Sequence, residues 1–351
     1  MSARTWPQIL GALTDGVDLT TEEAAWAIDE IFSDNATQAQ IAAFGIAMKM
    51  KGPTASELSG MAQGMLGHAR RVSLDVGAVD IVGTGGDRSG TVNISTMSAI
   101  VVSATGIPVV KHGNRAASSK SGGADVLEAL GVRIALGPDA VARSVHEVGI
   151  GFCFAPLFHP ALRFAGPARK EIGIPTVFNV LGPLTNPAQP GAGLIGCAFA
   201  DLLPVIAGAF AERGNNALVV RGNDGLDEIT TADTTDVWVV AAGHLTETTI
   251  DPTRIGIPRV PQEALRGGDA DTNAVIARNM LAGQPGPVRD AVLVNSAAAI
   301  VAYELTPETA GKDIHDALGA ALERVARTVD SGAAAQLLDR WVTFTNQFGT
   351  D

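Results

Sequence analysis

Three stretches in the first 70 residues carry apolar positions at the spacing of an α-helix. Each follows a Thr-x-x-Glu or Thr-x-x-Gln sequence, the pattern of a capping box, at Thr20, Thr37 and Thr54. Behind each cap, apolar residues recur in steps of three and four, so each helix is predicted to bury one face. The three faces are Ala24, Ile28 and Ile31; Ile41, Phe44 and Met48; and Leu58, Met61 and Met65. Residues 1–72 are therefore predicted to form a mainly helical domain, joined by a later segment near residues 165–190.

From Val79 onward the pattern changes to short apolar runs separated by helical segments. Strands are expected at 79–82, 107–110, 174–180, 194–198, 217–220 and 237–240, and helices over 94–104, 127–130, 202–211 and 317–329. This alternation is typical of a mostly parallel sheet with both faces covered. The Gly- and Pro-rich stretch 182–193 is predicted to be a loop. The expected fold is α/β: a small helical domain packed on a large α/β domain, residues 73–351, with a mostly parallel central sheet flanked by helices.

Composition narrows the possible partners. The 351-residue chain has 25 Lys and Arg against 37 Asp and Glu, a formal net charge of −12, and only 5% aromatic residues. Nucleic-acid binding favours a basic face and stacking rings, so no nucleic-acid partner is expected. No apolar run approaches the roughly 18 residues of a membrane helix, and no signal-peptide pattern opens the chain. We expect a cytoplasmic protein without a membrane partner, in which Cys153 and Cys197 are buried, inert thiols.

The strongest local signal follows the predicted strand 79–82. The sequence there is Gly-Thr-Gly-Gly-Asp over 83–87, and Thr91, Asn93, Ser95 and Thr96 stand at the start of the next predicted helix. Glycines let the backbone approach a ligand, and a helix N-terminus offers unpaired N–H donors and partial positive charge. The spacing matches neither a dinucleotide fingerprint nor a nucleotide P-loop. Taken alone, the segment is equally consistent with a phosphate cradle and with a tight strand-to-helix turn.

A second polar loop follows the next predicted strand. Residues 111–125 contain three cations, three serines, an asparagine and three glycines within an acidic protein. Ligands of open α/β sheets bind at the carboxyl ends of the strands. Two anion-binding loops on adjacent strands suit a ligand with two separated phosphate groups.

Two further segments contain candidate ligand-binding residues, the turn with Asp227 and Glu228 and the stretch around Arg169. Asp227 and Glu228 lie in a polar turn after strand 217–220; adjacent carboxylates favour a cation, and Mg²⁺ takes one or two carboxylates together with phosphate oxygens and water. On its own this segment is more often a simple polar turn. Residues 154–160 and 179–187 are typical of packing and turns, whereas the planar guanidinium of Arg169 suits a carboxylate.

Together these segments resemble the anthranilate phosphoribosyltransferases. The matching stretches are 83–87, 93–96, 111–115, 179–187 and 227–228, and the likeness runs from the N-terminal helices to 267–270 and 295–299. The resemblance implies the nucleoside-phosphorylase-like phosphoribosyltransferase fold, usually a homodimer formed through the helical domain. It implies pentosyl transfer from 5-phosphoribosyl 1-pyrophosphate (PRPP) to the amine of anthranilate, with Mg²⁺ as cofactor. The products would be N-(5-phosphoribosyl)anthranilate and pyrophosphate, in tryptophan biosynthesis.

The resemblance also implies the roles of individual residues. Lys111, Asn114 and Arg169 would be catalytic; Ser95, Asp227 and Glu228 would serve Mg²⁺; and Gly83, Asn114 and Arg169 would touch anthranilate. The residues that would hold PRPP are Gly83, Gly86, Asp87, Thr91, Asn93, Ile94, Ser95, Thr96, Lys111, His112, Gly113, Asn114, Arg115, Ala116, Ala117, Ser118, Ser119 and Gly123. In the family, the positions of Ala116 and Ala117 are often occupied by more polar residues. This difference affects side-chain contacts with PRPP more than backbone contacts.

The implied reaction is nucleophilic substitution at the anomeric carbon. Negative charge grows on the leaving pyrophosphate, and Mg²⁺, backbone N–H groups and Lys111 would stabilise it. The attacking aromatic amine is neutral at pH 7, so no strong general base is needed. His112 is a candidate either for orienting anthranilate or for a structural hydrogen bond.

Two alternative functions stay open at this point. One is a pyrimidine nucleoside phosphorylase of the same fold, which residues 111–119 argue against. The other is a non-catalytic, nucleic-acid-binding paralogue, which the net charge and the intact Asp227-Glu228 pair oppose.

Overall fold

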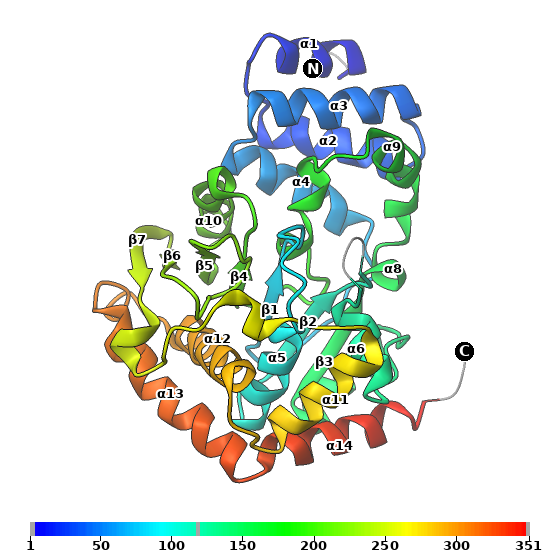
Figure 1. The fold of residues 1–351 in the computed structure, drawn as a ribbon. Helices are drawn as coiled ribbons and strands as arrows, with labels where there is room; N and C mark the ends of the chain where they lie inside the picture. The colour runs from blue at the N-terminus through cyan, green and yellow to red at the C-terminus, as the bar shows by residue number, and fades with distance from the viewer. Residues whose placement is uncertain (1–3, 117–119, 349–351) are drawn as a thin grey trace.

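The computed structural model describes residues 4–116 and 120–348, and four helices open the chain (Figure 1). They are α1 (Trp6–Thr14), α2 (Thr21–Phe32), α3 (Gln38–Lys51) and α4 (Ala55–Gly67). The predicted capping boxes are confirmed, since Thr20, Thr37 and Thr54 each accept a hydrogen bond from the backbone N–H three residues later. Every predicted face residue of these helices is buried. Within the described ranges, no helix is both long and apolar enough to cross a membrane.

The centre of the molecule is a seven-stranded sheet in the order β3-β2-β1-β4-β5-β6-β7. The first five strands in chain order run parallel to their neighbours: β1 (Val79–Gly83), β2 (Val109–Gly113), β3 (Ile150–Phe154), β4 (Ala192–Gly196) and β5 (Asn216–Gly222). The last two, β6 (Thr235–Ala241) and β7 (His244–Ile250), are antiparallel. The predicted mostly parallel sheet is therefore confirmed. Strand order reverses between β1 and β4, and ligands of open α/β sheets bind at such a switch point.

Helices cover both faces of the sheet (Figure 1). One face packs on a core that includes residues of α5 (Ile94–Ala104), α6 (Gly123–Ala129), α11 (Ala270–Leu281), α12 (Pro287–Glu304), α13 (Ile314–Asp330) and α14 (Ala333–Thr345). The other face meets α10 (Leu203–Glu212) and the N-terminal helices, whose buried side chains form one continuous cluster with β4 and β5. The remaining helices are α7 (Pro138–Val148), α8 (Ala155–Phe158) and α9 (Gly166–Ile172). Helix α9 is tied to α3 by the Gln38 side chain, which accepts a hydrogen bond from Ala168 N at 2.9 Å. The domain boundary at residue 72 stays a prediction.

The structure corrects several predicted strands. Residues 174–180 are not a strand; they form an irregular segment with a 3₁₀ turn at Val177–Asn179, where Pro175 lacks the N–H that a central strand needs. The strand predicted over 107–110 begins two residues later and ends three residues later, so Lys111 and His112 belong to β2 rather than to the loop. Strands β3 and β7 were not predicted. β7 is an edge strand whose sequence shows little alternation of apolar and polar residues, because most of its residues are polar and exposed.

The two cysteines behave as predicted. Cys153 lies in β3 and Cys197 directly follows β4, and both are buried. Burial raises the pKa of both thiols, which keeps them protonated.

Glycines end the two central strands where another segment crosses them. Gly83 of β1 and Gly196 of β4 are paired in register, and Asp227 lies against both. A Cβ atom on Gly196 would lie 1.6 Å from the carbonyl oxygen of Asp227, and one on Gly83 would lie 2.3 Å from its Oδ2. The approach of Asp227 to the sheet edge therefore requires that neither strand carries a side chain at this level.

We expect Gly196→Ala to destabilise the protein by about 1–3 kcal/mol, because the new methyl group must displace the backbone of Asp227. Gly191→Ala is the matched control, since Gly191 is exposed just before β4 and a Cβ atom there would meet nothing within 4 Å. Urea unfolding of the two variants and the wild type measures the difference. Equal midpoints for all three would contradict the steric argument.

Candidate active site

A cavity of about 410 Å³ lies at the carboxyl ends of β1 and β2. Its α/β wall consists of the loop after β1, the start of α5, the end of β2 with its loop, and the turn that contains Asp227 and Glu228. Its opposite wall comes from α4 and from the segment 155–183, which packs beside the N-terminal helices. The residues on this opposite wall are Met65, Ala155, Leu162, Arg169, Phe178, Asn179, Leu181, Gly182 and Pro183.

The loop after β1 presents backbone N–H groups to this region. Gly85 and Gly86 adopt positive φ angles of 67° and 90°, a conformation that glycine tolerates best. The N–H of Gly85 donates to Asp227 Oδ2 at 2.7 Å. In the first turn of α5, the N–H of Ser95 donates to Glu228 Oε1 at 2.9 Å. Each carboxylate of the acidic turn is thereby bonded to a different part of the β1–α5 segment.

Asn93, just before α5, holds the first loop against its surroundings. Its Nδ2 donates to the carbonyl oxygen of Ser121 at 3.2 Å, and its Oδ1 accepts from Asn273 at 2.9 Å. The contact with Ser121 links the loop after β1 to the loop after β2. The two predicted anion-binding loops therefore lie side by side.

The acidic turn is fixed from behind by α12. Asn295 accepts a hydrogen bond from Ile229 N at 3.0 Å and donates to Ile229 O at 2.9 Å. Burial, and then the negative charge of Asp87, raise the pKa of Asp227. Burial, and then the charge of Asp227, raise the pKa of Glu228. A site that disfavours the ionised form of two adjacent carboxyl groups is chemically suited to a cation that restores it.

Lys111 and His112 of β2 are buried beneath the cavity, at 4% and 3% exposure. The Lys111 ammonium donates to the carbonyl oxygen of Ile81 and to Ser95 Oγ at 3.2 Å. Burial lowers its pKa, whereas the negative charges of Asp80, Glu228 and Asp227 oppose this. The ammonium thus lies next to the residue whose N–H meets Glu228.

The His112 ring is held in one tautomer. Its Nδ1 lies 3.0 Å from the carbonyl oxygen of Gly182, so Nδ1 carries the proton and Nε2 is an acceptor. Nε2 is buried and has no hydrogen-bond partner within the described ranges. Burial, together with the neighbouring His159 at 5.1 Å between ring centroids, lowers the pKa of His112 to about 3. The ring is therefore neutral at pH 7.

The loop after β2 is closed by Asp125. Its Oδ2 accepts hydrogen bonds from Ala116 N at 3.1 Å and from Gly122 N at 2.8 Å. Arg115 is already paired, with Asp125 at 2.9 Å and with Glu128 at 2.5 Å. Ala117, Ser118 and Ser119 lie outside the described residues.

Arg169 of α9 faces the cavity from the opposite wall. Its guanidinium lies over the Phe178 ring, 5.8 Å from the centroid, and burial lowers its pKa. It makes no ion pair with any residue in the described ranges. A half-buried guanidinium without an anionic partner is suited to a carboxylate ligand.

Most of the predicted site residues meet around this one cavity. The residues that line it are Gly83, Gly86, Ser95, Lys111, His112, Gly113, Asn114, Arg115, Ala116, Gly123, Arg169, Asp227 and Glu228. Five others do not line it. Ile94 is fully buried in the core, and Thr96 is buried beneath Gly123. Asn93 links the two loops, as described above. Asp87 accepts a hydrogen bond from Ser89 Oγ at 2.7 Å, and Thr91 forms a β-bridge with Arg266. Their contacts with a ligand stay predictions.

The sequence interpretation missed the apolar part of the opposite wall. Met65 was predicted as a core residue, and Leu162 and Phe178 carried no signal that separates them from ordinary core residues. They come from three separate segments, so only the packing of the helical part on the sheet reveals that they share a surface.

The double variant Asp227→Asn with Glu228→Gln tests the electrostatic state of the turn. Each amide keeps an oxygen that can accept the hydrogen bond from Gly85 N or Ser95 N. The substitutions remove the buried negative charge. Because the pKa of both carboxyl groups is raised, the folded wild type binds protons more tightly than the unfolded chain, and its stability falls as the pH rises above about 4. We expect the metal-free variant to be more stable than wild type at pH 8, by at least about 1.4 kcal/mol, the equivalent of one pKa unit.

Thermal unfolding in a metal chelator, between pH 4 and pH 8, measures this effect. The advantage of the variant should shrink toward pH 4, where the wild-type carboxyl groups are protonated. A variant that is less stable than wild type at pH 8 would show that the charges are compensated in the metal-free protein.

Comparison with known proteins agrees with this geometry. Residues 7–69 match the helical bundle domain of a glycosyl transferase family, and residues 75–335 match the α/β domain of that family. The anthranilate phosphoribosyltransferase of Nocardia farcinica is 70% identical over 97% of this chain and 99% of its own length.

Solved structures give the same result. The anthranilate phosphoribosyltransferase of Thermus thermophilus superposes with a TM-score of 0.88 at 38% identity, over 96% of this chain and 99% of that one. That of Saccharomyces cerevisiae, solved in complex with PRPP and Mg, has a TM-score of 0.87 at 26% identity and covers 98% of both chains. The chain belongs to the anthranilate phosphoribosyltransferase family.

Proposed function

We propose that this chain transfers the 5-phosphoribosyl group of PRPP to the amine of anthranilate and releases pyrophosphate. The observation that carries the proposal is the convergence of two backbone-rich loops and an acidic turn on one wall of a cavity whose other wall holds an unpaired arginine. A doubly phosphorylated sugar suits the first wall, and an apolar carboxylate suits the second. The Nocardia relative and the yeast complex with PRPP and Mg support this assignment.

Mg²⁺ is the metal that the donor set fits. Asp227 and Glu228 offer hard oxygen ligands in a buried turn, beside the hydroxyl of Ser95. Among the described residues, no three His, Cys, Asp or Glu side chains are grouped to hold a metal by themselves. Phosphate oxygens of the donor would supply the further ligands that Mg²⁺ usually takes. When bound, the metal offsets the negative charge that develops on the leaving pyrophosphate.

The chain's own groups orient and stabilise the donor. The glycine loop after β1 and the loop around residues 113–116 bring backbone close to the donor, and the bonds from Gly85 N to Asp227 and from Ala116 N to Asp125 fix the shape of these loops. Lys111 places a buried positive charge next to Ser95, below the position of the pyrophosphate. These groups are fixed before the reaction begins, so they stabilise the developing charge without a cost of reorganisation.

The opposite wall binds anthranilate. Arg169 pairs with its carboxylate, and Phe178, Leu162 and Met65 pack on its ring. Asn114 and Gly83 border the same space. The unprotonated Nε2 of His112 accepts a hydrogen bond from the amine and orients it toward the sugar. The neutral amine needs no stronger base.

The proposal also includes a homodimer formed through the helical domain, in the cytoplasm. The dimer is supported by two exposed apolar residues of that domain, Val17 and Met50, at 55% and 83% exposure. The 70% identical relative argues against both alternative functions, the pyrimidine nucleoside phosphorylase and the nucleic-acid-binding paralogue.

The direct test follows the loss of anthranilate fluorescence with PRPP and Mg²⁺. Wild-type enzyme should turn over only when both are present, and the double variant Asp227→Asn with Glu228→Gln should lose roughly 10²–10³-fold in rate, the effect of removing a main electrostatic contributor. Release of free base from thymidine and phosphate, without turnover of anthranilate, would refute the proposal. Wild-type rates in the double variant would remove the metal site from it.

Arg169→Ala tests the acceptor side. Loss of a charge-assisted hydrogen bond costs about 1.5–3 kcal/mol, so we expect KM for anthranilate to rise about 10- to 100-fold while KM for PRPP changes little. Arg163→Ala is the matched control, because Arg163 is exposed nearby and its guanidinium lies over the Phe164 ring. Steady-state kinetics in both substrates measure the split, and equal increases in the two KM values would contradict the assignment.

A further inference from the structure

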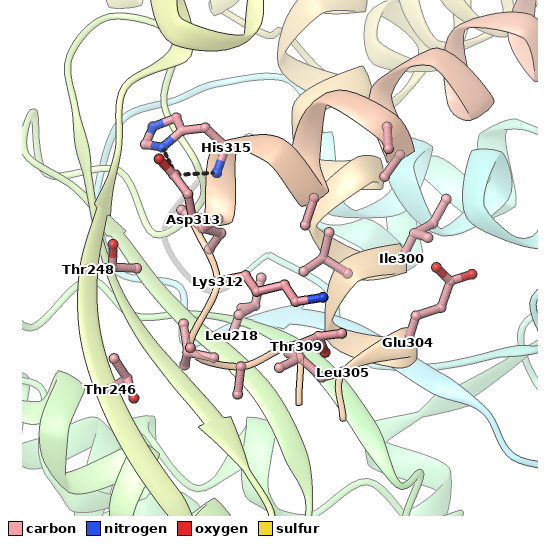
Figure 2. Close-up of a pocket in the computed structure, with 18 of the residues that line it drawn as sticks. Leu218, Thr246, Thr248, Ile300, Glu304, Leu305, Thr309, Lys312, Asp313 and His315 are labelled. Carbon is pink, nitrogen blue, oxygen red and sulfur yellow. Dashed lines mark hydrogen bonds and ion pairs between the residues drawn. The ribbon is translucent and has the colours of Figure 1, made fainter. Parts of the chain in front are cut away.

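A second cavity, of about 620 Å³, lies between the antiparallel edge of the sheet and helices α12 and α13 (Figure 2). It is larger than the catalytic cavity and shares no lining residue with it. Cavities of a few hundred Å³ with apolar floors and a few polar groups are the usual form of small-molecule sites. Nothing in the proposed reaction uses this one.

The floor of the second cavity is apolar. Leu218 of β5, Val239 of β6, Ile300 and Leu305 at the end of α12, and Ala321 of α13 line it. All five are buried against the main core. A ligand that covers this floor would remove apolar surface from water.

Strand β7 adds two hydroxyl groups at one side. Thr246 and Thr248 pair in register with Val239 and Val237, so they point to the same face of the sheet as those core residues (Figure 2). Neither hydroxyl makes a hydrogen bond with any described residue. Glu247 lies between them; its backbone alternates to the other face of this edge strand, and the residue also borders the cavity.

Two of the three Lys and Arg side chains that line the cavity are already paired. Asp313 is paired with Arg254 at 2.6 Å, and Glu304 with Arg324 at 2.9 Å. His315 accepts a hydrogen bond from Asp251 N at its Nε2, and its Nδ1 lies 2.9 Å from Asp313 Oδ1. Lys312 extends into the cavity and makes no ion pair with any residue in ranges 4–116 and 120–348 (Figure 2).

We propose that this cavity binds a small molecule with an apolar body and a single carboxylate, with the carboxylate paired to Lys312 and the body against Leu218, Ile300 and Ala321. One unpaired cation matches one negative charge. A phosphate group or a second carboxylate would bring further negative charge close to Glu247, Glu304 and Asp313. The proposal does not depend on the reaction at the first cavity.

Calorimetric titration with 1-naphthylacetate tests the proposal, with the neutral 1-naphthylacetamide as the shape-matched control ligand. Arg169→Ala enzyme is titrated beside the wild type, so that binding of the carboxylate at the catalytic cavity is removed. We expect 1-naphthylacetate to bind both proteins, and the amide to bind at least about tenfold more weakly, as expected for loss of a charge-assisted hydrogen bond.

Two variants locate the binding. Lys312→Gln should weaken 1-naphthylacetate about tenfold or more and leave the amide unchanged, and Ala317→Trp should block both ligands, because Ala317 lines the cavity and is exposed. Lys49→Gln, an exposed lysine of α3, is the matched control and should bind as wild type does. Unchanged turnover of anthranilate by all three variants shows that they are folded.

Three results would overturn the proposal. They are no heat of binding at millimolar ligand, equal affinity of Lys312→Gln and wild type for 1-naphthylacetate, and a crystal soaked with the ligand that shows it at another place. Each leaves the proposed phosphoribosyl transfer untouched, because that reaction is measured separately.

Discussion

The organisation of the cavity at the ends of β1 and β2 depends on two hydrogen bonds to adjacent carboxylates. Asp227 accepts the N–H of Gly85, and Glu228 accepts the N–H of Ser95, so one turn after β5 holds both the glycine loop and the start of α5. These bonds form only because Gly83 and Gly196 let the turn lie directly on the ends of β1 and β4. The result is a rigid edge in which the negative charges lie under backbone donors rather than beside arginines. The cost of burying those charges is what makes the turn receptive to a divalent cation.

The two walls of the cavity have different origins and different chemistry. The α/β wall is polar and consists largely of backbone, which suits phosphate groups whose shape is recognised by N–H geometry. The helical wall is mostly apolar, and its charged residue is Arg169, whose guanidinium lies over Phe178. A reaction between a phosphorylated sugar and a flat aromatic acid needs both walls, and each is contributed by a different part of the chain.

Local signals made much of the fold predictable. The capping boxes and the helix over 94–104 depend on residues within one or two turns, and the structure confirms them. Residues 174–180 were misassigned because apolar residues that pack against helices give the same short run as a strand. β7 was missed because a polar edge strand lacks an apolar run.

The candidate site was predictable only in part. The glycine loops and the acidic turn have unusual local composition, and the sheet topology brings them together as expected. The burial of Lys111 within β2, the ion pairs that engage Arg115 and the apolar wall around Phe178 arise from contacts between distant segments. No spacing along the chain encodes them.

Helix α12 contacts both the turn that contains Asp227 and Glu228 and the second cavity. Its middle holds the turn through Asn295, and its last residues, up to Glu304, border the second cavity. These two points are about 14 Å apart along one continuous helix, at 1.5 Å per residue. The turn that contains Asp227 and Glu228 and the second cavity are thus supported by the same helix, so a rigid shift of that helix would move both.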